Sequence, residues 1–342
     1  MQAPSLRARI RARARTRVRL VVTGLVTALA VVLAPSTSGG AAHAASVLPY
    51  VPLSSYLGAG WTDAYVPSSD NDCVAGRSSC LGSTLRALSK IADSTARSCT
   101  HDAIFARAYV RMTQLYGYTR QIPGYYQDVP ETNHLDAAFA QYFTDAYGNW
   151  QSGHRAAVPQ AWLIALDAAR SRTVTGSGDL LLGMNAHINR DLAFVLAATG
   201  LVAPDGSSRK PDYDAVEKWL YDATAPLMAE LAARFDPSID DSADPAGLSY
   251  WTLFQVISGW RENAWRNAEA LVSAPTPTDR AQVAARIESE ANAAAQSLLV
   301  SQAYTPPLTS TTSRDSWCAA HDGDAPPMAY DFGMAGPWGY AY

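Results

Sequence analysis

The spacing of apolar residues is the feature that most constrains how this chain can fold. Between Cys73 and Ala303, apolar residues recur every three or four positions, and runs of β-branched residues, which are typical of strands, are scarce. This periodicity predicts an all-α, multi-helix bundle. The expected helices cover residues 81–94, 100–116, 133–147, 159–169, 178–198, 212–235, 249–272 and 277–302.

Local signals refine two of these helices. Thr276 can cap the last helix, and Pro277 suits its first position because proline there gives up an amide that would be unpaired anyway. Pro226 lies inside the 212–235 helix. It is expected to bend or split that helix, because proline removes a donor and crowds the preceding turn.

The first 44 residues have the pattern of a signal peptide. Seven arginines precede an apolar run of 14 residues, Leu20 to Leu33, and Ala42-His43-Ala44 then offers a small-x-small cleavage site. The apolar run is shorter than the roughly 20 residues that span a bilayer comfortably. We therefore expect cleavage before Ala45, a secreted, extracellular protein, and no stable membrane anchor afterwards.

The remaining chain is expected to form a helical domain between two arms. Residues 45–72 read as an irregular N-terminal arm, 73–303 as the helical domain, and 304–342 as an irregular C-terminal arm packed on that domain. Seven of the 27 basic residues and none of the 31 acidic residues lie in 1–44, so 20 basic and 31 acidic residues leave a net charge of −11. This charge argues against nucleic acid as a partner. A small molecule or a cell-envelope component remains possible.

Four cysteines all lie beyond the expected cleavage site, which fits an oxidising compartment. Of the three possible pairings we favour Cys73 with Cys80 and Cys99 with Cys318, and free thiols are the alternative. The second bridge would bring His101 to a His-Asp-Gly-Asp run in the C-terminal arm. An accessory cation site could form there, although solvated surface charge is the favoured interpretation.

One expected helix carries a concentrated polar motif. Its apolar residues form a stripe that must face the core, with His187 and Asp191 one turn apart on one flank and Asn185 and Asn189 on the other. Only Arg190 points away from the stripe. The four flanking side chains should be partly buried, so each needs a hydrogen-bond partner.

Two interpretations of this motif stay open. His187 and Asp191 can hold one divalent metal, zinc being the first choice, or the carboxylate can orient the imidazole as a general base. Either role makes both residues catalytic candidates, with Asn185 and Asn189 in the pocket, and leans weakly towards a metal-assisted hydrolase. Alternatively the side chains only fix helix register in a non-catalytic binding protein. A lone H-x-x-x-D arises often by chance, so the structural role is favoured.

Two more positions are candidates for the same pocket. Glu262 could act there as a further ligand or as an acid/base, with Arg261 and Trp265 beside it. The alternative is an Arg261–Glu262 ion pair with the tryptophan packed in the core. Asp136 is a further candidate on another helix, and surface solvation is its expected role.

Two sequence motifs resemble those of an uncharacterised helical family common in actinobacteria. They are A-H-I-N-x-D-L at residues 186–192 and R-E-x-A-W at residues 261–265. The resemblance implies a helical fold and singles out these residues, but it implies no reaction. A more distant likeness is to the zinc-dependent phospholipase C and single-strand nuclease group, which uses H-x-x-x-D on a metal-binding helix. Only five histidines follow the cleavage site and the N-terminal tryptophan is missing, so this likeness implies one metal at most.

Overall fold

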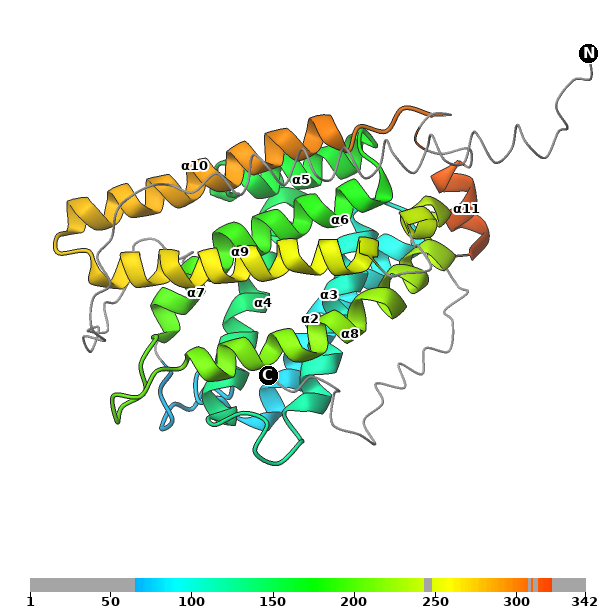
Figure 1. Ribbon diagram of the computed structural model, residues 1–342. Coiled ribbons are helices and arrows are strands. Elements are labelled where there is room, and N and C mark those ends of the chain that lie inside the picture. Colours follow the sequence, from blue (N-terminus) through cyan, green and yellow to red (C-terminus); the bar gives the residue numbers. More distant parts are fainter. Residues whose placement is uncertain (1–64, 243–247, 307–308, 310–312, 322–342) are drawn as a thin grey trace, which may run out of the picture.

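The computed structural model describes residues 65–242, 248–306, 309 and 313–321 of the 342 (Figure 1). The predicted signal peptide and residues 45–64 of the predicted N-terminal arm lie outside these residues. The described chain is all-α, which confirms the predicted class; its only β-type pairs are two isolated bridges, Val174 with Ala303 and Val202 with Ser208. None of the described helices is long and apolar enough to span a bilayer.

The helices follow the predicted order, with longer ends. They are α2 (Ser78–Arg97), α3 (Ala103–Thr119), α4 (Val129–Gln151), η1 (Arg155–Ala157), α5 (Gln160–Ser171), α6 (Gly176–Met184), η2 (Asn185–Asp191), α7 (Leu192–Thr199), α8 (Lys210–Arg234), η3 (Pro237–Ser242), α9 (Leu248–Ser273), α10 (Pro277–Ser301) and α11 (Arg314–His321).

Capping residues explain where two of these helices begin. The side chain of Thr276 accepts a hydrogen bond from the amide of Asp279 at the start of α10, as its sequence predicts. Asp128 does the same for the amide of Glu131 at the start of α4, where Pro130 occupies the first turn. Each cap supplies an acceptor to an amide that has no partner inside its own helix.

The structure corrects three details of the predicted helices. Pro226 does not split its helix, because α8 is continuous and the flanking Ala223 and Leu227 are buried, so packing outweighs the lost hydrogen bond. The segment 178–198 is not one α-helix; its middle, η2, is a π-helix. The C-terminal arm, predicted to be irregular, contains α11.

The helices pack around a central segment that runs from α6 through η2 to α7. The long helices α9 and α10 are joined by a short turn and contact each other, and α8 runs below α9 in the view of Figure 1. The π-helix η2 contacts α4, α5, α9 and α10. Trp162, Phe143 and Phe194 are among the largest fully buried side chains. The polar motif therefore lies in the middle of the core rather than at its edge.

Two disulfides hold the ends of the described chain. Cys73 pairs with Cys80, and Cys99 pairs with Cys318, so both predicted bridges are confirmed. The second bridge ties α11 to the turn between α2 and α3. It closes a separation of 219 residues, which in the chain-entropy model makes it the more stabilising of the two bridges.

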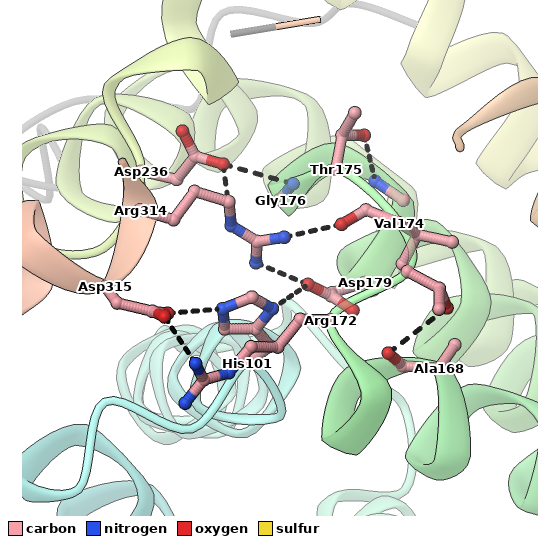
Figure 2. A network of polar contacts seen from close by, with 12 residues as sticks. His101, Ala168, Arg172, Val174, Thr175, Gly176, Asp179, Asp236, Arg314 and Asp315 are labelled. Carbon is pink, nitrogen blue, oxygen red and sulfur yellow. Dashed lines mark hydrogen bonds and ion pairs between the residues drawn. The ribbon is translucent and has the colours of Figure 1, made fainter. Parts of the chain in front are cut away.

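A buried ionic network also attaches α11 to the bundle. Figure 2 shows the guanidinium of Arg314 between two carboxylates. It lies 2.5 Å from Asp179 and 3.0 Å from Asp236, and it also donates a hydrogen bond to the carbonyl of Val174. Arg314 is 3% exposed. The backbone amide of Gly176 donates to Asp236. The first turn of α6 and the start of α11 are therefore fixed to each other by charges that water cannot screen well.

His101 belongs to the same network. Its Nε2 lies 2.9 Å from Asp315, which also pairs with Arg172 (Figure 2). Burial, followed by the nearby positive charge of Arg314, lowers the pKa of His101 to about 4. His101 is thus neutral and already engaged at ordinary pH. The acidic run predicted to join it in a cation site, residues 322–324, lies outside the described residues.

Candidate functional site

An apolar cavity of about 190 Å³ lies inside the bundle. Its wall is formed by side chains of α3, α4, α6, η2, α7, α8 and α9, and most of them are aliphatic or aromatic. Protein interiors are close-packed and rarely hold voids much larger than a water molecule. A cavity of this size with a mostly apolar wall is therefore a candidate site for a small molecule.

The motif residue His187 lines this cavity and is held by Asp191. The Nδ1 of His187 lies 3.2 Å from Oδ2 of Asp191. Trp162 Nε1 donates to the same oxygen at 2.7 Å, and Arg190 donates to the other oxygen at 2.6 Å. The carboxylate thus accepts three buried hydrogen bonds. This arrangement assigns the proton of the neutral imidazole to Nδ1 and leaves a lone pair on Nε2.

The imidazole of His187 lies among aromatic rings. It stacks on Phe139 with ring centres 3.5 Å apart and meets Tyr109 at 4.6 Å. Burial lowers the pKa of His187, although the hydrogen bond to Asp191 acts in the opposite direction. The Nε2 atom is buried and has no hydrogen-bond partner among the described residues. His187 therefore offers one free acceptor at the cavity wall.

The π-helix η2 positions the side chain of His187 at the cavity wall. Within it, Asn189 donates to Asn185, which in turn donates to the carbonyl of Ala291 in α10. At the preceding Gly183 an added Cβ would lie 2.5 Å from the ring of Phe105, so only glycine allows this approach of α6 to α3. Single π-turns inside helices are frequent at functional sites.

The two asparagines of the motif do not reach the cavity. Asn185 and Asn189 were expected in the pocket, but neither is among the residues of the cavity wall. Their hydrogen bonds connect η2 to itself and to α10. The motif is therefore divided between roles: the asparagine flank fixes helix packing, whereas His187 borders the cavity and Asp191 holds it in place.

Asp136 also lines the cavity, which contradicts its expected role in surface solvation. Burial raises its pKa to about 7, and the charge of Arg120 opposes this only in part. No ion pair or hydrogen bond involves its carboxyl group within the described residues. Its position could have been read from the sequence, because Thr132, Leu135 and Phe139 share its helix face.

Two hydroxyl groups of the wall were not singled out from the sequence. Tyr109 and Thr113, one turn apart on α3, line the cavity, and neither hydroxyl has a hydrogen-bond partner in the described structure. Burial, together with the charges of Asp136 and Asp191, raises the pKa of Tyr109 well above its usual range. Its phenol therefore stays protonated. Nothing in the sequence distinguishes these two residues from ordinary core side chains.

Helix α9 carries the candidates Arg261, Glu262 and Trp265, and only the first of them lines the cavity. Arg261 lines the cavity, and its guanidinium contacts Glu217 and the carbonyl of Tyr213. Glu262 lies outside the cavity wall, with its side chain 45% exposed and paired with Lys210 and Arg266. Trp265 is buried in a neighbouring core cluster. In place of the alternative Arg261–Glu262 pair, Arg261 pairs with Glu217 of α8, and Glu262 pairs with Lys210 of α8 and with Arg266 of its own helix.

The donors at His187 suit a metal poorly. Zinc sites need three or four protein ligands. Both oxygens of Asp191 are already engaged, which leaves Nε2 of His187, and within the described ranges no three His, Cys, Asp or Glu side chains are grouped closely enough to hold an ion. The arrangement instead matches a histidine oriented by a carboxylate, which can accept a proton or a hydrogen bond.

A family model agrees with the extent of this bundle. A family of unknown function (DUF5995) matches residues 81–301, which include α3 to α9 and therefore the whole cavity wall. The chain belongs to this family. No curated protein and no solved structure matches it. The family has no described activity, so the function has to be argued from the cavity itself.

Proposed function

We propose that this chain is an exported protein that binds a small, largely apolar molecule in the cavity of its helical bundle. The cavity of about 190 Å³ is the observation that supports this proposal most directly. An engineered cavity of about 150 Å³ in another protein binds benzene, so the space here is sufficient for a ligand with at least one ring.

The lining supplies the driving force for such binding. Aromatic and aliphatic side chains such as Phe105, Phe139 and Leu220 form most of the wall. Moving apolar surface from water into this environment is favourable by about 25 cal/mol per Å². A few polar atoms, notably Nε2 of His187, can then fix the orientation of the ligand, as is usual in small-molecule sites.

Export is supported by the two disulfides, which fit an oxidising compartment. It also rests on the Arg-rich and apolar residues of the N-terminal 44. Mass spectrometry of protein from the culture medium should find a mature N-terminus at or near Ala45. A full-length chain retained with the cells would contradict the export part of the proposal.

Binding can be tested with an apolar fluorescent probe such as N-phenyl-1-naphthylamine. Titration of the purified chain from Ala45 onward should show saturable binding with a stoichiometry of one. Ala108→Phe places a ring in the cavity wall and should abolish binding, whereas the matched change Ala293→Phe on the exposed face of α10 should leave it unchanged. Val216→Phe is a second filling variant in case the first disturbs folding. Equal binding by all variants would refute the cavity as the site.

Acid–base conversion of the bound molecule is a second candidate function. The orientation of His187 by Asp191 favours it, since a neutral imidazole with a free Nε2 can act as a general base, for example towards water attacking an ester. Hydrolysis of 4-nitrophenyl butyrate by the parent chain, lost in His187→Gln and unaffected by a chelator, would support this function without a metal. Equal rates in both chains would refute it.

A further inference from the structure

We propose that the molecule held in the cavity is an apolar amine, whose ammonium group pairs with the carboxylate of Asp136 while its hydrocarbon body fills the rest of the space. This inference rests on the proposed binding function and names the class of its ligand. It comes from the distribution of charge and of unpartnered polar atoms around the cavity.

Asp136 supplies the negative charge. Among the described residues of the cavity wall it is the only acidic one, and none of the described residues makes an ion pair or hydrogen bond with it. A carboxylate inside an apolar enclosure is costly unless a cation pairs with it. The positive charge that acts on Asp136 is that of Arg120, whose guanidinium donates hydrogen bonds to Asn133 and to the carbonyl of Ser78. A cationic ligand would supply the missing partner.

Arg261, the only lysine or arginine among the described wall residues, is already neutralised. Arg261 contacts Glu217 at 3.3 Å, donates to the carbonyl of Tyr213 at 2.6 Å, and lies 4.1 Å from the centre of the Tyr213 ring. With Arg261 balanced by Glu217, the cavity retains one net negative charge, that of Asp136. An anionic ligand would meet this charge without compensation.

Aromatic rings surround the same region. Tyr109, Tyr116, Phe139 and Trp219 all line the cavity, and Asp136 acts electrostatically on the first two. The faces of such rings attract cations, most strongly where water is excluded. An ammonium group beside Asp136 would therefore gain both an ion pair and cation–π contacts.

The unpartnered polar atoms of the wall also suit an amine. The charge of Asp136 acts on the hydroxyl of Tyr109, and the ring centres of Tyr109 and His187 lie 4.6 Å apart. The hydroxyl of Tyr109 and Nε2 of His187 can each accept a hydrogen bond, and neither has a partner in the described structure. An ammonium group carries three donors. It could satisfy Asp136 and these neighbouring acceptors together.

The test is calorimetric titration with three ligands that differ only in the polar end: 4-phenylbutylamine, 4-phenylbutan-1-ol and 4-phenylbutanoate. At pH 8 the amine should bind at least about tenfold more tightly than the alcohol, as expected for a charge-assisted bond, and the carboxylate should bind most weakly. Asp136→Asn should remove the advantage of the amine and leave the affinity for the alcohol within about twofold. Asp145→Asn, on the same helix but outside the cavity wall, is the matched control.

The affinity for the amine should also rise as the pH passes 7, where Asp136 ionises, and this rise should be absent for the alcohol. Of the other groups near this region, Glu131 also has a pKa raised to about 7, so the part of the rise that Asp136→Asn removes is the part that belongs to Asp136. The tyrosines at 109, 116 and 213 have raised pKa values and His187 has a lowered one, so none of these four groups titrates near pH 7.

Each of the other outcomes refutes either the amine inference or the proposed binding function. If the alcohol binds as tightly as the amine, or Asp136→Asn keeps the preference, the amine inference is wrong and the cavity still binds apolar molecules. If the carboxylate binds most tightly, Arg261 is the recognising group and the inference is again wrong. If none of the three ligands and no apolar probe binds, the proposed function itself fails.

Discussion

Replacing Asp136 with asparagine should stabilise the folded chain at neutral and alkaline pH. Burial raises the pKa of this carboxyl from 3.8 to about 7, so the folded chain holds its proton more tightly than the unfolded chain does. As the pH rises from 4 to 8, ionisation therefore costs the folded state more, and the free energy of unfolding falls. Asparagine does not titrate, so the variant should lack this loss.

The size of this difference in the free energy of unfolding follows from the shift in the pKa of Asp136. One pKa unit corresponds to about 1.4 kcal/mol, so a rise from 3.8 to about 7 sets an upper limit of about 4 kcal/mol. Asp136 borders the cavity and keeps part of its surface accessible, which lets water reduce the cost. We expect about 2 kcal/mol of difference to develop between the parent and Asp136→Asn from pH 4 to pH 8.

Urea unfolding of both chains at each pH unit from 4 to 8 measures this difference directly. Glu131 and Asp179, whose pKa values burial also raises to about 7, are present in both chains and cancel. Asp70→Asn, a change of the same kind at an exposed position, is the control. Parallel stability curves for the parent and Asp136→Asn would show that this carboxyl is solvated in the folded chain and would remove the electrostatic basis for ligand pairing.

Three further predictions concern stability, each measured by urea unfolding. Asp191→Asn should lower the free energy of unfolding by about 1 to 3 kcal/mol, because the Asp191 carboxylate accepts three buried hydrogen bonds. His187→Phe should lower it less, because one ring nitrogen of His187 has no partner in the described structure. Equal losses in the two variants would contradict this. Arg314→Leu should cost about 3 to 5 kcal/mol, since it strands two buried carboxylates, and a neutral effect would mean that they protonate instead. Replacing Cys99 and Cys318 together by serine should cost about 2 to 5 kcal/mol and leave the other disulfide intact by peptide mapping.

Local features of the sequence predicted the helices well where the local signal agreed with the packing. Thr276 and Pro277 start a helix because capping depends on neighbours three residues away. The split that was one of the two expected effects of Pro226 does not occur, because the cost of a proline in a helix is local, whereas the burial of Ala223 and Leu227 that outweighs it depends on distant helices. The π-helix at 185–191 carried no recognisable signal in the sequence.

The candidate site was only partly accessible from the sequence. Helical periodicity correctly placed His187 beside Asp191 on a largely apolar face, because side chains four residues apart share a face. It also grouped Asn185 and Asn189 with them, while Glu262 was a separate candidate from another helix; the structure places these three residues outside the cavity wall. Spacing along one helix cannot tell which neighbouring helix lies opposite each flank.

The sequence by itself determined the all-α class and the approximate helix positions, because periodicity and caps are properties of the chain alone, and it favoured the observed cysteine pairs among three possible pairings. Only the tertiary structure decided that Asp136, Tyr109 and His187, from three different segments, border one cavity, and that Arg314 closes the C-terminal helix onto the bundle. Those relations depend on how helices cross in space. A cavity is bounded by residues far apart in sequence, so no local pattern records it.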